Sequence, residues 1–450
     1  MVDQTMDQLS KAVTCCNALG LDVYARFTHS RPLENLFFSP FALTVGLSMT
    51  LAGARDSTAE EIMDLMHMNR GLFETQKEIV DLVQFLRTDE VDMSVATGAF
   101  VRLGFRPTDD YWATVRRVYG GAVHEVDFVE NSEVVRRNIN TWVRDQTNNQ
   151  IKEMLSPGSV TSATRLCMVN GIRFRAVWTD PFFPTEIRRH EFLSSEDEPA
   201  DVDVEMMSHI GEYAYLVDRD MSFTAVEVPH KGGKTSLVIV MPHQRHDFRE
   251  LEKREELDKL LGLTARMVKT PDVELCLPRL KLDMNIQMDS MLYYMGLSDL
   301  FTETANLGGM FGVGQKMHVT EWVHHAVAEM ANDAAGSPGD VSPACEPDSP
   351  PGTPLDTPPD EPGGSPGRRS SVSINTVPSY HFIPSRESVS TMPPPAKGCL
   401  RKGGKSTKKV RRASMVRTTI PFMVNRPFVF FVLHRDLSLL LFLGVVKKIS

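Results

Sequence analysis

The stretch NLFFSPFALTVGLSMTLAG, residues 35–53, carries a full set of helix signals. Ser39 precedes Pro40, which is the order of an N-cap residue followed by a proline at the first helical position. The apolar run that follows, residues 41–51, is closed by Gly53. These residues predict an apolar helix over 41–51.

Further helix signals lie on both sides of this stretch. Near the start of the chain, Leu9, Val13 and Cys16 recur at helical spacing. After it, the residues TAEE at 58–61 have the pattern of a capping box, which predicts the start of the next helix.

Strand signals dominate later in the chain. Residues 235–241 form a β-branched apolar run, and residues 273–277 alternate apolar with polar or small side chains before Pro278. The tail 428–446 is apolar, but the residues HRD at 434–436 divide it, so two strands joined by a polar turn explain it better than a membrane span. Helices that come first and strands that come late, without regular alternation, predict an α+β fold.

The composition is that of a soluble globular chain. The protein has 450 residues, of which 42% are hydrophobic and 24% charged, and this excludes collagen-like, coiled-coil and disulfide-scaffold proteins. Its six cysteines are sparse, and no Cys or His pair has zinc spacing. We therefore expect reduced thiols, no metal site and no cofactor.

One internal segment differs from the rest in both composition and charge. Residues 338–395 hold fifteen of the 28 prolines, which predicts a disordered or polyproline-like insert. Residues 334–396 have seven acidic and three basic side chains, whereas residues 397–417 have nine basic and no acidic ones. The chain is thus divided into a body at 1–333, an insert at 334–419 and C-terminal strands at 420–450.

The N-terminal residues lack the basic start and apolar core of a signal peptide. No Asn-x-Ser/Thr acceptor for glycosylation occurs in the chain. We expect a cytoplasmic or nuclear location, with unconventional export as the open alternative.

A set of collinear motifs covering about four fifths of the chain resembles the serpin family of serine protease inhibitors. The motifs are NLFFSP (35–40), LAGAR (51–55), VDF (126–128), NINTWV (138–143) with QTN (146–148) and IK (151–152), VNGI (169–172) with Trp178, VPHKGG (228–233), LPRL (277–280), MGL (295–297) and FMVNRPFVFF (422–431).

This resemblance implies a serpin fold of about nine helices around three β-sheets, with an exposed reactive loop that is greatly extended here. In this family a serine endopeptidase attacks the loop and forms an acyl-enzyme. The cleaved loop then inserts into the largest sheet and distorts the protease, so the activity is suicide-substrate inhibition. The family has no catalytic residues of its own, and the chain is expected not to be an enzyme.

The resemblance also implies a conformational switch beneath the largest sheet. Ser39, Asn170 and His324 match a buried, hydrogen-bonded cluster that holds the central strands closed. Trp178 matches a tryptophan at the top of that sheet, although from sequence alone a single tryptophan is more often a plain core aromatic. His324 and His325 are adjacent and would point to opposite faces of a strand, which argues against a shared metal ion.

The reactive loop departs from the family's pattern. The hinge retains small residues at Ala334, Ala335, Gly336 and Ser337, but Pro338 offers no N–H to a β-ladder and Asp340 would bury a carboxylate. The scissile candidates counted back from the C-terminal signature are Arg412, Ala413, Ser414 and Arg417. Counting forward from the hinge gives a position about 65 residues earlier, and a chain of that length spans roughly 40 to 50 Å without tension. A captured protease would therefore not be pulled, and we expect a substrate more than a trap.

The basic segment from Lys397 to Arg417 has three interpretations. It is a solvated linker, a contact for a nuclear-import receptor, or bait for a trypsin-like serine endopeptidase. Nucleic acid is an unlikely partner because the segment has no aromatic residues for base stacking, and no membrane partner is expected. For the whole chain, the alternatives to inhibition are a non-inhibitory serpin scaffold with a regulated interaction loop, or a gene model that carries an unremoved insert.

Overall fold

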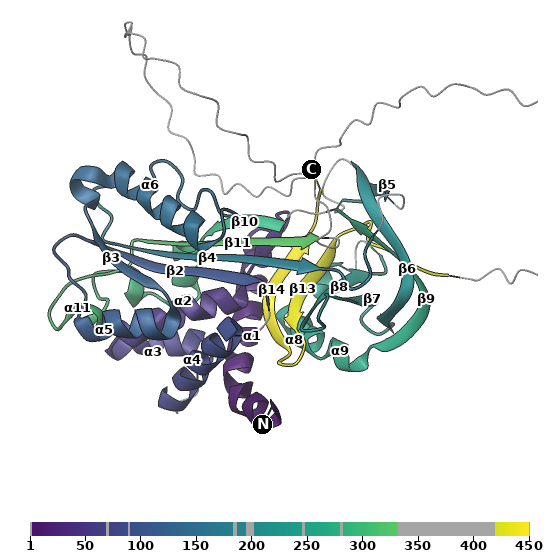
Figure 1. Cartoon of the computed structure of the whole chain (residues 1–450), viewed down its shortest axis with the longest axis horizontal. Coiled ribbons are helices and arrows are strands. Elements are labelled where there is room, and N and C mark those ends of the chain that lie inside the picture. The colour runs from purple at the N-terminus through teal and green to yellow at the C-terminus, as the bar shows by residue number, and fades with distance from the viewer. Residues whose placement is uncertain are drawn as a thin grey trace, which may run out of the picture.

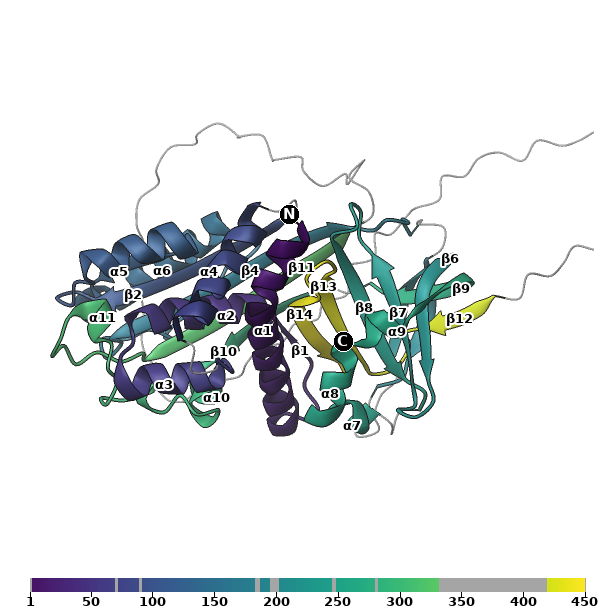
Figure 2. The same ribbon diagram turned by 90° about the horizontal axis from the view of Figure 1, so that it is seen from below.

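A five-stranded sheet and a nine-stranded sheet, with helices packed around them, make up the computed structural model shown in Figure 1. The structure describes residues 2–68, 72–88, 91–182, 187–194, 202–244, 248–279, 282–331 and 419–449. Figure 2 shows the same molecule turned by 90°, with the long helix α1 running across it.

Most of the longer helices lie in the first third of the chain. The helices up to Gln146, with the π-helical turn that follows α5, are α1 (Val2–Ser30), α2 (Pro40–Gly53), α3 (Asp56–Leu65), α4 (Leu72–Thr88), α5 (Asp109–Thr114), η1 (Val115–Tyr119) and α6 (Phe128–Gln146). The helices later in the chain are α7 (Phe248–Leu251), α8 (Arg254–Leu261), α9 (Leu263–Arg266), α10 (Asp289–Tyr294), the 3₁₀ turn η4 (Asp299–Phe301) and α11 (Gly308–Phe311).

The predicted apolar helix is confirmed as α2. The Ser39 hydroxyl oxygen accepts a hydrogen bond from the Ala42 N–H at 3.0 Å, and Pro40 occupies the first turn. The helix predicted from Leu9, Val13 and Cys16 is confirmed as α1, which spans Val2–Ser30.

The start of α3 was predicted wrongly. The helix begins at Asp56, so Thr58 lies inside its first turn and does not cap it. The Thr58 hydroxyl oxygen instead accepts the N–H of Asn306 at 2.9 Å, in a loop that is distant along the chain. A distant backbone partner has replaced the local one that the capping-box pattern assumes.

The five-stranded sheet has the order β10 (Leu282–Gln287), β11 (Glu321–Ala331), β4 (Leu166–Val177), β2 (Met93–Arg102), β3 (Ala122–Val126). β11 and β4 are parallel, as are β2 and β3, and the other neighbours are antiparallel. In Figure 1, α6 lies on one face of this sheet and α2 to α5 lie on the other.

The nine-stranded sheet has the order β1 (Leu36–Phe38), β14 (Leu439–Val446), β13 (Phe428–His434), β8 (Thr235–Pro242), β7 (Phe223–Pro229), β6 (Val202–Asp218), β9 (Val268–Pro278), β12 (Ile420–Met423), with β5 (Ile187–Phe192) paired to β6. The 17-residue β6 pairs with β7 through its last residues and with β5 through its first. It therefore joins two of the three expected sheets into one. The strands predicted at 235–241, at 273–277 and in the divided tail are all confirmed.

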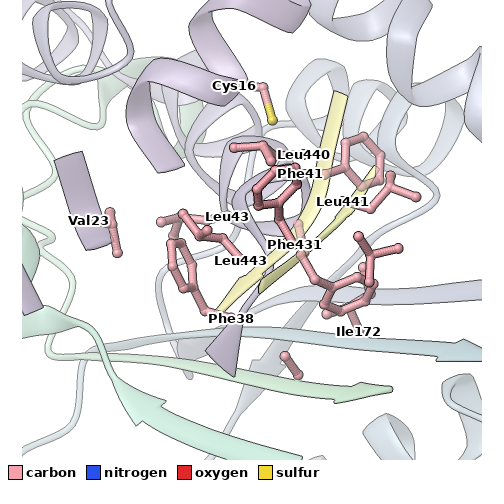
Figure 3. Close-up of a cluster of buried hydrophobic side chains, with 14 of the residues drawn as sticks. Cys16, Val23, Phe38, Phe41, Leu43, Ile172, Phe431, Leu440, Leu441 and Leu443 are labelled. Atoms are coloured by element: carbon pink, nitrogen blue, oxygen red, sulfur yellow. The ribbon is translucent and has the colours of Figure 1, made fainter. Parts of the chain in front are cut away.

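The main core lies between α2 and the strands of both sheets. Figure 3 shows Phe38 and Leu43 beside Phe431 and Leu443, all of them buried. Full burial of each such side chain contributes about 1.5–3 kcal/mol relative to exposure in water. A second, smaller core on the other face of the five-stranded sheet packs α6 against β2, β4 and β11. The central strands are thus covered on both faces.

Candidate functional site

The seam between β4 and β11 is where the two central strands of the five-stranded sheet meet. They pair in parallel over eleven positions, from Glu321 opposite Cys167 to Ala331 opposite Val177. Neighbouring strands lie about 4.8 Å apart, so a new strand between them requires their separation to double. In the described chain this seam is fully closed.

A buried hydrogen-bonded cluster crosses the seam. His324 Nδ1 lies 2.7 Å from Asn170 Oδ1, and the backbone N–H of Ser39 donates to His324 Nε2 at 3.1 Å. Because Nε2 is the acceptor, the proton of the neutral ring sits on Nδ1 and is donated to Asn170. Asn170 Nδ2 in turn donates to the hydroxyl of Thr97 on β2 at 2.9 Å.

Ser39 extends the cluster to the second sheet. Its hydroxyl donates to the carbonyl oxygen of Leu441 on β14 at 2.6 Å. The network therefore links β2, β4 and β11 to the N-terminus of α2 and to β14. The structure brings Ser39, Asn170 and His324 together as the sequence suggested. Sequence reasoning missed Thr97, whose only signal is a hydroxyl between the small residues Ala96 and Gly98.

The buried imidazole of His324 is held in its neutral form. Burial lowers its pKa to about 3, and the neighbouring His325 adds a smaller effect in the same direction. A neutral ring is what the acceptor role of Nε2 requires. His325 belongs to a different set of contacts, since its Nε2 lies 2.8 Å from Asp283 Oδ1 on β10. The two histidines do not share a site.

The other end of the seam is closed by weaker contacts. Arg175 on β4 and Glu329 on β11 form an ion pair with 3.9 Å between Nε and Oε2, too long for a hydrogen bond. Trp178 follows β4 directly and is buried against His230, with ring centroids 5.1 Å apart. Eight residues of strand separate Trp178 from Asn170, a distance of about 26 Å, so the tryptophan is not part of the His324 cluster.

The predicted hinge and scissile residues lie outside the described residues. They are Ala334, Ala335, Gly336 and Ser337 in the hinge, and Arg412, Ala413, Ser414 and Arg417 at the scissile region. The nearest residues that the structure describes are Ala331, the last residue of β11, and Thr419, just before β12. Residues 332–418 therefore connect the end of the seam to the start of β12.

β12, which follows Thr419, is held in the nine-stranded sheet by backbone pairing and by side-chain contacts. It pairs in parallel with β9, and the Thr419 hydroxyl donates to the carboxylate of Glu274 on β9 at 3.2 Å. Phe422 is buried and packs edge-on against Tyr215 on β6. Both ends of the connection 332–418 are thus fixed to the folded body.

Within the described ranges, no three His, Cys, Asp or Glu side chains gather as a metal ion would require. None of the helices described is both long and apolar enough to cross a bilayer.

Sequence comparison finds many related proteins. A profile of the family described as Serpin (serine protease inhibitor) matches residues 14–358. Iris of Ixodes ricinus is 32% identical over 313 residues, which cover 69% of this chain and 82% of that protein. Leukocyte elastase inhibitor A of Mus musculus is 30% identical over 356 residues, which cover 76% of this chain and 91% of that protein.

Solved structures share the fold. Uncleaved ovalbumin superposes with a TM-score of 0.73 at 22% identity, over 98% of this chain and 99% of that one. Human thyroxine-binding globulin superposes with a TM-score of 0.74 at 20% identity, over 98% of this chain and 100% of that one. At these identities the likeness establishes the architecture and the order of strands.

Proposed function

The chain belongs to the serpin family, and from this premise we propose that it offers residues 332–418 to a serine endopeptidase and is cleaved there mainly as a substrate. The family's activity is suicide-substrate inhibition by insertion of the cleaved loop into the large sheet. The observation that carries the proposal is that Pro338 and Asp340 follow the hinge in the residues that would have to enter the closed β4–β11 seam, whose strands pair directly over eleven positions. In this reaction the protease supplies the catalytic residues, and this chain supplies the peptide bond.

An inserting strand must come from the residues that follow Ala331. To enter between β11 and β4, these residues have to turn back and run antiparallel to β11, with their N–H groups bonded to a neighbour on each side. Pro338 has no N–H to give, and Asp340 would carry a carboxylate into a sheet that is covered on both faces. Insertion is therefore expected to stop after the hinge residues 334–337.

The position of the basic residues gives a second argument. Arg412 and Arg417 are the scissile candidates, and they lie far beyond Ala331 along the chain. A strand as long as β4 uses only 12 residues. About 65 residues then remain between the inserted part and the protease, so the stabilisation of the sheet cannot be transmitted as a distorting force.

The proposed protease has trypsin-like specificity, because nine Lys and Arg residues lie between 397 and 417. The same segment is our candidate contact for a nuclear-import receptor. A cytoplasmic or nuclear location is supported by Cys15, Cys16, Cys167 and Cys276, which are all free and buried in the described part of the chain, as is usual in reducing compartments.

Incubation with a trypsin-like protease tests the proposal. We expect cleavage within 397–417, a protease that stays active, and no SDS-stable adduct on a denaturing gel. Thermal unfolding of the body should change little after cleavage, because the sheet has not gained a strand. A stoichiometric adduct, or a large stabilisation on cleavage, would restore the inhibitory mechanism.

The matched control is a variant from which the surplus chain, from Pro338 onward, has been deleted, so that the hinge runs directly into a short loop ending near Arg412. This variant should form more SDS-stable adduct with the protease, because both Pro338 and the surplus length of chain are removed. If proteases of several specificities leave residues 332–418 of the full chain uncut, the protein is instead the non-inhibitory scaffold.

A further inference from the structure

Residues 147–165, called the strap below, join α6 to β4 and cross the face of the five-stranded sheet on the side of α6. The Ile151 side chain lies over β4, since its Cδ1 is 3.2 Å from where a Cβ on Gly171 would be. Farther along, the Met154 carbonyl oxygen accepts a hydrogen bond from Asn285 Nδ2 on β10 at 2.8 Å. Because β11 lies between β4 and β10, the strap passes over the β4–β11 seam.

The strap is fastened to α6 by several hydrogen bonds. Asn140 Oδ1 accepts the N–H groups of Met154 at 3.1 Å and Leu155 at 2.8 Å, and Asn140 Nδ2 donates to the Leu155 carbonyl at 2.9 Å. Arg136 Nη1 donates to the same carbonyl at 2.7 Å while its other nitrogens hold Glu133. We therefore expect the strap and α6 to move as one unit.

The underside of the strap is apolar and spans both strands of the seam. Its buried residues belong to the smaller core together with residues of β4 and β11; they are Ile151, Met154, Leu155 and Val160 from the strap, Cys167 and Val169 from β4, and Val323 and Val327 from β11. Apolar contacts are non-directional, so they persist when the strap slides over the strands. The hydrogen bond from Asn285 is directional, so it does not tolerate such sliding.

We propose that Asn285 is a latch that holds the strap over the closed seam and thereby limits how often β4 and β11 separate. Entry of a strand moves β10 and β11 about 4.8 Å away from β4. The hydrogen bond from Asn285 to Met154 does not survive such a displacement unless the strap follows, and the strap is retained by the bonds from Asn140 and Arg136. The single bond from Asn285 is thus the one that breaks first. The latch acts on the sheet itself and does not depend on whether a protease is trapped.

Hydrogen exchange of the full-length protein, followed by mass spectrometry, tests this latch. Asn285→Ala should accelerate exchange of the paired amides of β4 and β11 several-fold, up to about tenfold, which is the effect of losing one neutral hydrogen bond. Asn285→Asp keeps the size of the side chain but replaces the donor with a carboxylate facing the Met154 carbonyl. This variant should exchange faster still.

Gln287→Ala is the matched control. Gln287 is on the same strand, and its Nε2 donates to the Glu321 carboxylate on β11 at 2.6 Å, so its loss removes a side-chain amide bond from β10 that does not reach the strap. Exchange across the seam should change less in this variant than in Asn285→Ala. Equal acceleration in the two variants, or acceleration in Asn285→Ala that extends equally to β13 and β14, would overturn the proposal. So would an unchanged seam in Asn285→Ala.

Discussion

The two ends of the β4–β11 seam are closed by different chemistry. At the first, His324 and Asn170 are fully buried and each bonds to further groups on other elements. At the second, five positions farther along the strands, the Arg175 and Glu329 side chains are 40% and 52% exposed and 3.9 Å apart. Breaking the first leaves buried polar groups unpaired, whereas the second simply exchanges its partner for water.

The difference indicates the direction in which the seam opens. The weak end is the C-terminal end of β11, which ends at Ala331. Among the described residues, the first buried side-chain hydrogen bond across the seam that a separation beginning there meets is His324–Asn170, about 17 Å away. We therefore expect the buried cluster to limit how far β4 and β11 separate. The following predictions test whether the two ends differ as much as their burial suggests.

The largest effect is expected for His324→Ala. Truncation leaves the Ser39 N–H and the Asn170 side-chain oxygen unpaired in a buried site and creates a cavity. We expect the free energy of unfolding to fall by about 3–5 kcal/mol, measured by urea denaturation. His325→Ala is the adjacent control, and it should lose less because Asp283, its partner, retains access to water. Equal losses would mean that the cluster has no special role.

The second prediction is a loss of stability in mild acid. The pKa of His324 is lowered by burial to about 3 in the folded chain, while an unfolded histidine titrates near 6.5. Its contribution is therefore fully present above pH 6.5 and is lost as the pH falls from about 6.5 towards 3, because only the unfolded chain takes up the proton. At pH 5 the loss is about 2 kcal/mol.

The comparison needed is between the wild type and His324→Gln, which cannot titrate. Urea midpoints measured at pH 7.5 and pH 5 should shift less in the variant. The difference between the two proteins removes the effect of other buried groups, such as His230, whose pKa is also lowered to about 3 by burial. Identical pH dependence in both proteins would rule out His324 as the acid-sensitive group.

The third prediction concerns the residue that sequence reasoning missed. Thr97→Val keeps the shape of the side chain but removes the acceptor for Asn170 Nδ2. The free energy of unfolding should fall by about 1–2 kcal/mol, since one buried donor is left unpaired. Thr97→Ser retains the hydroxyl and should lose less. If Val is tolerated as well as Ser, Asn170 has no need of this partner.

The sequence predicted those parts of the molecule that depend on local chemistry or on motifs. Ser39 and Pro40 predict the start of α2, because an N-cap residue and a proline both act within one helical turn. His324 and Asn170 were named only through the family resemblance, since they are far apart along the chain and no local pattern connects them. Thr97 and Asn285 stayed hidden for the same reason, because their partners are set by strand register and by the path of the strap. The prediction of the start of α3 failed because the Thr58 hydroxyl accepts a hydrogen bond from a distant loop.

The smallest effect is expected at the exposed end of the seam. Arg175→Ala or Glu329→Gln should change the free energy of unfolding by less than about 0.5 kcal/mol, because a half-exposed ion pair at 3.9 Å gains little over hydration. The small contribution that exists should vanish in 1 M salt, where the screening length is about 3 Å. A double-mutant cycle in urea, at low and high salt, measures it directly. A coupling above about 1 kcal/mol that persists in salt would show that this end is locked as well, and the direction of opening inferred from the two ends would then be wrong.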